Sequence, residues 1–351
     1  MIKVLIVEDS PVVQSLLEHI LRSDAEIKVI GTVSTGLDAV VFAKKYQPNV
    51  ITMDIELPGM NGFEATRRIL EEAPVPIIIV SSHYQKENLA MTFQALEAGA
   101  VAVEEAPPGI GHREFAEKSK RLIQTIKSIA RVKVRTKRLS LPLKTSPPQI
   151  RPKNIGKRIK CIAIGASTGG PLVLKEIFSQ LPADFPAPIL VVQHITTGFL
   201  KGLVDWLNQT TVMPIHIAYH GEYALPGHVY FAPDNFHLGI QSNGRLVLSK
   251  EAPEKNIRPA VSFLFRSVSK AFGSSAVGIL LTGMGEDGAQ GLKIMRERQA
   301  ITIAQNKESC VIFGMPGEAI RIGAAAYVLS PEAIALTLKE LVTGSSEQGF
   351  N

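Results

Sequence analysis

Residues 161–170 read Cys-Ile-Ala-Ile-Gly-Ala-Ser-Thr-Gly-Gly, a short apolar run that ends in a glycine-rich turn. The apolar run is too short for a helix and suits a strand that is buried on both faces of a sheet. The glycines permit a tight turn, and a helical pattern follows Gly170. The stretch therefore predicts strand, turn and helix, the repeating unit of a parallel α/β sheet. Ser167 would then lie at a helix N-terminus, where backbone amides favour negative charge.

The same alternation continues from this stretch to the end of the chain. The strand candidates are Cys161–Gly165, Ile189–Gln193, Ile215–Ala218, Val229–Phe231, Leu246–Leu248, Ala276–Leu281, Ile301–Ala304 and Ala326–Leu329. Helical segments follow Gly170, Gly198, Pro259, Gly288 and Pro331. The stretch Tyr219–Lys250 is rich in Gly, Pro and Asn, which is typical of a β-hairpin. We predict a larger, Rossmann-like parallel-sheet domain with a β-hairpin insertion over residues 159–345.

The beginning of the chain predicts a smaller domain of the same α/β class. Its strand candidates are Lys3–Val7, Lys28–Val33, Val50–Met53, Pro76–Val80 and Val101–Val103. Its helical patterns are Pro11–Arg22, Leu37–Lys45, Gly62–Glu72, Glu87–Ala98 and Arg113–Ala130. Five alternations of strand and helix predict a five-stranded, doubly wound parallel sheet over residues 1–130.

A basic, proline-containing stretch lies between the two domains, and we predict a linker over residues 131–158. Residues 117–160 carry 15 basic groups and one acidic group, whereas the whole chain has a net charge of +6. Like charges combined with prolines offer little to bury, which favours an extended tether. The pattern argues against nucleic-acid binding, because the stretch contains no aromatic side chain on which a base could stack.

Composition places the chain among globular proteins. No apolar run approaches the roughly 20 residues that a membrane-spanning helix needs, so we expect no membrane insertion and a cytoplasmic location. The two cysteines, Cys161 and Cys310, agree with a reducing compartment, and no CxxC pair indicates zinc or redox chemistry.

Carboxylates follow two strands of the first predicted sheet. Glu8 and Asp9 follow the first strand, and Asp54 follows the third. Because ligands bind at the carboxyl edge of a parallel sheet, we expect these three groups to lie together. Three neighbouring carboxylates repel one another unless a cation neutralises them, and oxygen ligands suit Mg²⁺. Beside the metal, Asp54 could attack a phosphoryl donor.

Three further groups follow strands of the second predicted sheet. Ser167 follows the first strand, His194 follows Ile189–Gln193, and Asp287 lies in the loop after Ala276–Leu281. If these strands are neighbours, a hydroxyl, an imidazole and a carboxylate meet at one edge, as acyl transfer requires. Backbone amides near Thr168 and Met284 are the candidate oxyanion donors.

Two other readings of these motifs stay open. Gly283, Gly285 and Gly288 match the dinucleotide pattern GxGxxG, although Asp287 would repel a pyrophosphate. A metal site is the weaker alternative. His216 and His220 are four residues apart, but the strand predicted at Ile215–Ala218 would not place them on one helical face. No partner is evident for His112, His228 or His237.

At the three carboxylates the sequence resembles a response-regulator receiver. The resemblance implies that Glu8, Asp9 and Asp54 hold Mg²⁺, that Asp54 accepts a phosphoryl group from a histidine kinase, and that Ser81 is the switch hydroxyl. One residue departs from the pattern, because Ala106 stands where the family has a lysine before Pro107. Without that ammonium, coupling of phosphorylation to conformation should weaken.

Over its whole length the sequence resembles the chemotaxis response-regulator protein-glutamate methylesterases. The resemblance implies a catalytic triad of Ser167, His194 and Asp287 that needs no cofactor. It also implies hydrolysis of glutamyl methyl esters on methyl-accepting chemoreceptors, with deamidation of glutamines as a second activity. The family's Arg-Pro-Ser-Val-Asp segment matches residues 258–262, except at Ala260 and Ser262. The alternative is a receiver-controlled regulator that binds nucleic acid or a nucleotide.

Overall fold

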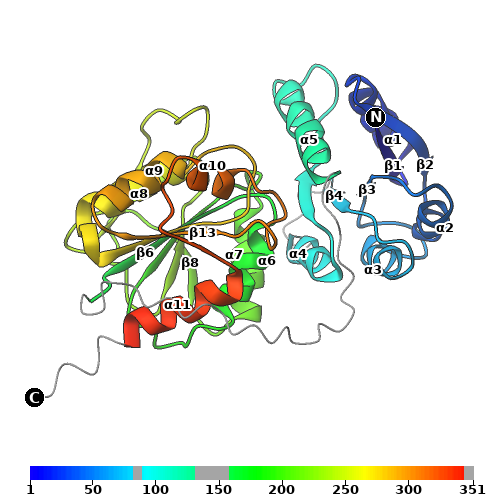
Figure 1. The fold of residues 1–351 in the computed structure, drawn as a ribbon. Coiled ribbons are helices and arrows are strands. Elements are labelled where there is room, and N and C mark those ends of the chain that lie inside the picture. Colours follow the sequence, from blue (N-terminus) through cyan, green and yellow to red (C-terminus); the bar gives the residue numbers. More distant parts are fainter. Residues whose placement is uncertain (82–88, 131–157, 344–351) are drawn as a thin grey trace, which may run out of the picture. The chain divides into compact units, whose positions relative to one another are not determined.

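A computed structural model of the chain describes residues 1–81, 89–130 and 158–343 (Figure 1). The described residues form two compact units, one up to residue 130 and one from residue 158. The predicted linker lies outside the described residues except for Arg158, and so do the first two residues of the helix predicted at Glu87–Ala98. The exact bounds of the domains therefore stay predictions.

The first unit is a five-stranded parallel sheet with the strand order β2-β1-β3-β4-β5, which confirms the predicted doubly wound fold. Its strands are β1 (Ile2–Val7), β2 (Ile27–Val33), β3 (Val50–Met53), β4 (Ile77–Ser81) and β5 (Ala102–Glu105). Its helices are α1 (Pro11–Arg22), α2 (Gly36–Tyr46), α3 (Gly62–Glu72), α4 (Leu89–Ala98) and α5 (Phe115–Ile129).

Local sequence signals fix where these elements begin. Pro11 opens α1 at a position where its missing N–H costs nothing. The side chains of Thr35 and Asn61 accept backbone N–H groups at the starts of α2 and α3. Because β1 pairs directly with β3, the residues that follow these two strands, Glu8 and Asp54, lie side by side at the carboxyl edge.

The second unit contains a seven-stranded sheet with the order β14-β13-β12-β6-β7-β9-β8, in which every pair is parallel. Its strands are β6 (Cys161–Ala166), β7 (Ile189–Gln193), β8 (Ile215–Ile217), β9 (Val229–Phe231), β12 (Ala276–Leu280), β13 (Ile301–Gln305) and β14 (Tyr327–Leu329). The three strands that carry the predicted triad, β12, β6 and β7, are neighbours at the centre of the sheet.

Helices cover both faces of this sheet. They are α6 (Gly170–Phe178), α7 (Leu200–Thr210), α8 (Val261–Phe272), the 3₁₀ turn η1 (Gly273–Ser275), α9 (Ala289–Glu297), α10 (Met315–Arg321) and α11 (Pro331–Thr343). In Figure 1, α8, α9 and α10 lie on one side of the sheet and α6 and α11 on the other. The Rossmann-like arrangement predicted for this domain is confirmed.

The inserted hairpin is shorter than the stretch predicted for it. It consists of β10 (His237–Ile240) and β11 (Leu246–Ser249), which pair in antiparallel fashion and pack on α8. The strand β9 also falls within Tyr219–Lys250, but it belongs to the parallel sheet between β7 and β8. The sequence shows a short apolar run at β9 and cannot show its partner, because a parallel partner lies far away in the chain.

Helix α10 was not expected from the sequence. It has seven residues and begins at Met315 and Pro316, directly after Gly314. Two helical turns contain too few apolar positions to produce a recognisable period. This helix matters because Met315 packs against the loop that holds Gly283.

Packing of α8 on the sheet gives a test of this architecture. Phe265 on α8 is completely buried in the core of the second unit. We expect Phe265→Ala to lower the free energy of unfolding of this unit by about 3–5 kcal/mol, because it removes apolar contacts and leaves a cavity. Urea unfolding followed by the fluorescence of Trp206, the single tryptophan, measures this unit selectively.

A matched control is Leu336→Ala on α11, whose side chain is 41% exposed and should change stability by roughly 0.5 kcal/mol or less. Equal midpoints for Phe265→Ala and the unchanged chain would contradict the packing described for α8.

Candidate active site and receiver site

Ser167 lies in the tight turn between β6 and α6. Gly169 has a φ of 81°, in the left-handed region that glycine adopts without strain, and it turns the chain into the helix. The N–H of Ser167 donates to the carbonyl of Thr282 at 3.0 Å, which ties the turn to the loop after β12. Ser167 is half-buried and stands at the carboxyl edge of the sheet, as predicted.

His194 stands next to Ser167 on the neighbouring strand. In the β6–β7 ladder Ala166 is the register partner of Gln193, so the residues that follow them are Ser167 and His194. The N–H of His194 donates to the carbonyl of Ala166 at 2.8 Å. Neighbouring strands are about 4.8 Å apart, so a hydroxyl and an imidazole projecting from these positions lie within reach of each other.

Asp287 completes the group from the other side. Its Oδ2 atom lies 3.0 Å from Nε2 of His194, and both side chains are largely buried. The carboxylate is thus in direct contact with one ring nitrogen of the imidazole. The structure therefore brings the carboxylate to the imidazole, and leaves Nδ1 as the ring nitrogen available to a second partner.

Backbone amides hold the Asp287 carboxylate in place. The N–H groups of Val261 and Ser262, at the start of α8, donate to Oδ2 and Oδ1 at 2.7 and 3.0 Å. The N–H of Gly288 donates to Oδ1 at 2.7 Å. Burial alone would raise the pKa of Asp287, but the neighbouring His194 and these N–H groups outweigh it and hold the pKa well below its ordinary value. Asp287 is therefore an anion throughout the physiological range.

The two residues expected to supply oxyanion donors lie on the loops around Ser167. Thr168 directly follows the serine, and Met284 directly follows Gly283. A Cβ at Gly283 would lie 2.6 Å from Cβ of Ser167, so the two loops are in close backbone contact. Thr168 and Met284 are both half-buried at this rim, and their catalytic role stays a prediction.

A network of buried polar groups, which sequence reasoning missed, connects these loops. The hydroxyl of Thr282 lies 3.0 Å from the carbonyl of Thr168 and accepts from the N–H of Ile312 at 2.9 Å. The N–H of Thr282 donates to Oε1 of Gln305 at 2.7 Å. The sequence contains only a weak indication of this network, namely that Thr282 and Gln305 are polar residues near the ends of buried strands.

The dinucleotide alternative does not agree with this geometry. Gly288 precedes α9, and its N–H is taken by the Asp287 carboxylate at 2.7 Å instead of being directed towards an outside anion. The space above Gly283 is filled by Ser167 and by Sδ of Met315. A pyrophosphate would need that space and those amides.

A small pocket of about 170 Å³ adjoins Asp287. Charged side chains dominate its wall, and two ion pairs cross it, Lys255 with Glu286 and Arg266 with Glu254. Its lining consists of Glu254, Lys255, Ser262, Arg266, Glu286, Asp287, Ala289, Gln290 and Glu318. Ser262, where the sequence departs from the family pattern, therefore both holds Asp287 and borders this pocket.

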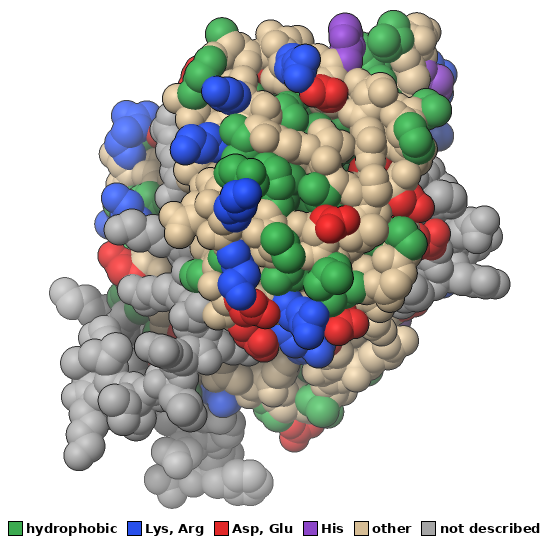
Figure 2. All heavy atoms as spheres, turned by 90° about the vertical axis from the view of Figure 1, so that its right-hand side faces the viewer, with side chains coloured by type: hydrophobic (Ala, Val, Ile, Leu, Met, Phe, Trp, Pro, Cys, Tyr) green, Lys and Arg blue, Asp and Glu red, His purple; other side chains and the backbone are tan. Residues whose placement is uncertain are grey.

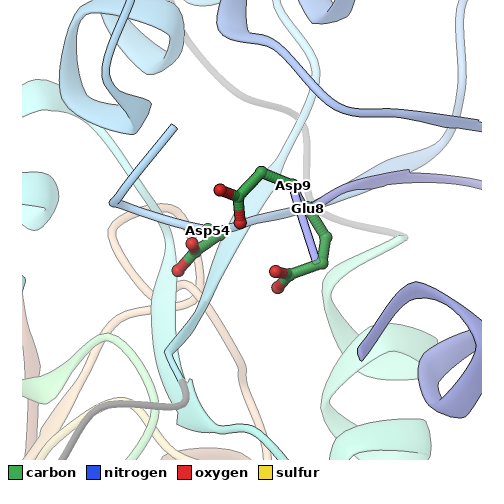
Figure 3. Close-up of side chains that lie close together, drawn as sticks. All are labelled: Glu8, Asp9 and Asp54. Atoms are coloured by element: carbon green, nitrogen blue, oxygen red, sulfur yellow. The ribbon is translucent and has the colours of Figure 1, made fainter. Parts of the chain in front are cut away.

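The first unit brings its three predicted carboxylates together. Oxygen atoms of Glu8, Asp9 and Asp54 lie within 4.8 Å of one another, and Figure 3 shows them gathered where β1 and β3 end. Among the residues that the structure describes, this is the one group of three or more His, Cys, Asp or Glu side chains with spacing suited to a metal ion.

Electrostatics at this cluster favour a cation. Burial, followed by the charge of Asp54, raises the pKa of Glu8 from 4.5 to about 7. Burial also raises the pKa of Asp54, and Asp9 adds to this effect. Crowded carboxylates that resist ionisation are the donor set that a hard cation such as Mg²⁺ would stabilise, so the residues fit the metal that a receiver domain implies.

Ser81 and Ala106 lie at the ends of two adjacent strands, and Ala106 directly follows β5. Ser81 is the last residue of β4, and the N–H of Ala106 donates to its carbonyl at 2.9 Å. The methyl side chain of Ala106 carries no charge that could contact a phosphoryl group. On α5, the ammonium of Lys118 lies 2.7 Å from the buried carboxylate of Glu105. The structure therefore places Ala106 beside the switch position.

Two histidines for which the sequence showed no partner, His228 and His237, have hydrogen-bond partners in the structure. Nε2 of His216 lies 2.8 Å from Nδ1 of His228, so His228 does have a partner, which the sequence could not reveal across two strands. His220 instead accepts a hydrogen bond from the N–H of Leu248. His237 is completely buried and bonds backbone groups through both ring nitrogens. None of them joins a three-ligand cluster among the described residues.

The surface gives no support to a nucleic-acid interface on the face drawn in Figure 2, where Lys and Arg side chains lie among Asp and Glu side chains. A nucleic-acid-binding face would carry its positive charge as a patch or stripe. Among residues 1–81, 89–130 and 158–343, no helix has the length and apolar character that crossing a membrane requires.

Comparisons with known proteins identify both units. Family models match as CheB methylesterase over residues 162–338 and as Response regulator receiver domain over residues 4–103. A protein-glutamate methylesterase/protein-glutamine glutaminase 1 of Syntrophus aciditrophicus is 51% identical over 345 residues, covering 97% of this chain and 98% of that protein. A protein-glutamate methylesterase/protein-glutamine glutaminase of Nitrosospira multiformis is 46% identical over 351 residues, covering 99% of both.

Among solved structures, the CheB methylesterase catalytic domain of Thermotoga maritima has 43% sequence identity and a TM-score of 0.51. The match covers 53% of this chain and 99% of that domain. With its receiver fold, its catalytic fold and relatives that align over nearly its full length, the chain belongs to the CheB methylesterase family.

Proposed function

We propose that the chain hydrolyses glutamyl methyl esters on chemoreceptors, with deamidation of glutamines as a second activity of the same site. The observation that carries this proposal is the contact of His194 with Asp287 at 3.0 Å, next to Ser167 on the neighbouring strand. A nucleophile, a base and an orienting anion at one edge of a sheet support acyl transfer. The names of the relatives point to the same substrates.

In the proposed reaction, His194 takes the proton of the Ser167 hydroxyl while Oγ attacks the γ-carbonyl carbon of the ester. With Nε2 directed at Asp287, Nδ1 is the nitrogen that receives this proton. Asp287 stabilises the imidazolium because its carboxylate stays ionised. The tetrahedral intermediate expels methoxide, which takes the proton from His194 and leaves as methanol.

Water then completes the turnover. His194 takes a proton from water as the water oxygen attacks the carbonyl carbon of the acyl-enzyme. The bond from that carbon to Oγ then breaks, His194 returns the proton to Oγ, and the free Ser167 hydroxyl and a glutamate on the receptor are formed. The amides of Thr168 and Met284 are proposed to donate to the oxyanion, from the two loops that meet at Ser167 and Gly283. With glutamine as substrate the same steps release ammonia in place of methanol.

The receiver site is proposed to regulate this reaction. Asp54 would accept a phosphoryl group from a histidine kinase, and Glu8, Asp9 and Asp54 would hold Mg²⁺. Bound Mg²⁺ would supply positive charge that offsets the carboxylates and the phosphoryl oxygens. Because Ala106 offers no ammonium, we propose that phosphorylation changes the activity less than it would with a lysine there. A cytoplasmic location, where such kinases act, stays an expectation.

Replacing the nucleophile tests the proposed chemistry. We expect Ser167→Ala to reduce methanol release from methylated receptor by about 10⁴-fold or more, because no other hydroxyl replaces Oγ. The control is Ser179→Ala at the end of α6, whose hydroxyl bonds only its own helix, through the carbonyl of Lys175. Normal turnover in Ser167→Ala, with the control also active, would rule out the serine mechanism.

Magnesium affinity should depend on pH with a defined sign. Because the pKa of Glu8 is raised to about 7, this carboxyl binds a proton as the pH falls below 7, and the proton competes with the metal. We expect Mg²⁺ to bind roughly tenfold or more tightly at pH 8 than at pH 5.5, measured by titration calorimetry. Glu8→Gln should flatten this dependence, and a steep dependence in that variant would assign it to other groups.

Restoring the lysine tests the proposed weak coupling. We expect Ala106→Lys to increase activation by a small phosphodonor about fivefold or more, because the ammonium would contact the phosphoryl group on Asp54. The same substitution combined with Asp54→Asn should show no activation. A large, Asp54-dependent activation of the unchanged chain, with no gain from the lysine, would contradict this proposal.

A further inference from the structure

Gln193 is a buried amide between the two residues that carry the proposed chemistry. It is the last residue of β7, lies directly before His194, and is 5% exposed. Its Nε2 donates to the carbonyl of Ser167 at 2.9 Å and to the carbonyl of His194 at 2.8 Å. One side chain thus bonds the main chain of both residues.

The orientation of this amide is determined by its neighbours. Both atoms that face it are carbonyl oxygens, which can only accept, so the NH₂ group has to face them. The other end, Oε1, is buried and has no hydrogen-bond partner among the described residues. A Cβ at Gly170 would lie 2.2 Å from Oε1, so this oxygen lies against the first residue of α6. The positive end of the helix dipole there favours it.

The two bonds to Nε2 complete a short connection between strands. Ser167 is tied to the β12 side through its N–H and to α6 through its carbonyl, which also accepts from the N–H of Gly170 at 2.8 Å. His194 is tied to β6 through its N–H and Ala166. Gln193 adds a direct bridge from the carbonyl of Ser167 to the carbonyl of His194. Burying Oε1 of Gln193 without a hydrogen-bond partner costs free energy, and the two hydrogen bonds of Nε2 offset that cost.

We propose that Gln193 is a positioning residue that fixes the distance between the hydroxyl of Ser167 and the imidazole of His194. The inference rests on the proposed acyl-transfer function. Gln193 touches no reacting atom, so its effect has to be expressed in the rate of the chemical step. Substrate affinity should be unaffected, because no substrate group contacts this buried side chain.

Two substitutions of similar size test the bridge. Gln193→Met removes the donor, and Gln193→Glu replaces it with an oxygen that repels both carbonyls. We expect kcat for methanol release to fall by about 10- to 100-fold in both variants, with KM within about twofold of the unchanged chain, since small misplacements of reacting groups are costly. Thermal unfolding followed by Trp206 fluorescence measures how much of each variant is folded.

Two controls separate positioning from general damage. Leu190→Val changes another buried residue of β7 and should lower the unfolding midpoint while kcat stays unchanged. Gln180→Met removes a comparable amide that bonds only Glu176 within the α6 region, and should leave kcat unchanged.

Three outcomes would overturn the proposal. The first is a normal kcat in the folded Gln193 variants. The second is a raised KM at unchanged kcat. The third is a fall in kcat that matches the loss of folded protein. Absence of ester hydrolysis in the unchanged chain would instead remove the proposed function itself, so the two failures are distinguishable.

Discussion

The second unit depends on how one buried carboxylate, that of Asp287, is kept ionised. Taking a carboxylate out of water is costly unless hydrogen-bond donors replace the solvent. Here the N–H groups of Val261 and Ser262 come from the start of α8, the N–H of Gly288 precedes α9, and His194 approaches from β7. The same charge therefore fixes two helix starts against the central strands and orients the imidazole, so that fold and site share one interaction.

In the first unit, the pKa values of the buried carboxylates of Glu8 and Asp54 are shifted in the opposite direction to that of Asp287. Glu8, Asp9 and Asp54 lie close together, and burial raises the pKa values of Glu8 and Asp54. Carboxylates crowded in this way are the donor set that a hard cation stabilises. Asp287 accepts three backbone N–H groups and its pKa is lowered, whereas the pKa values of Glu8 and Asp54 are raised. This contrast agrees with the constant role proposed for Asp287 and the ligand-dependent role proposed for the receiver carboxylates.

The sequence predicted the parallel sheets, because their strands are short apolar runs, and Glu8, Asp54, Ser167 and His194 each follow such a run directly, whereas Asp287 lies farther along the loop after β12. Ser167 and His194 follow β6 and β7, and the register of those strands then makes them neighbours. The supporting contacts were not predictable, since Thr282 bonds Gln305 and Ile312 across loops that only the folded sheet brings together. Helix α10 was missed because two turns are too short for a period. The hairpin was overestimated because turn-rich composition does not reveal which strands pair.

The close contact between Gly283 and Ser167 limits which substitutions this edge of the sheet can accept. A Cβ on residue 283 would lie only 2.6 Å from Cβ of Ser167, and Sδ of Met315 closes the remaining space at 2.4 Å from that position. A side chain added at Gly283 would therefore displace the loop that holds Ser167. A substitution of Gly283 would in this way act on the turn that holds Ser167, although the two residues belong to loops after different strands.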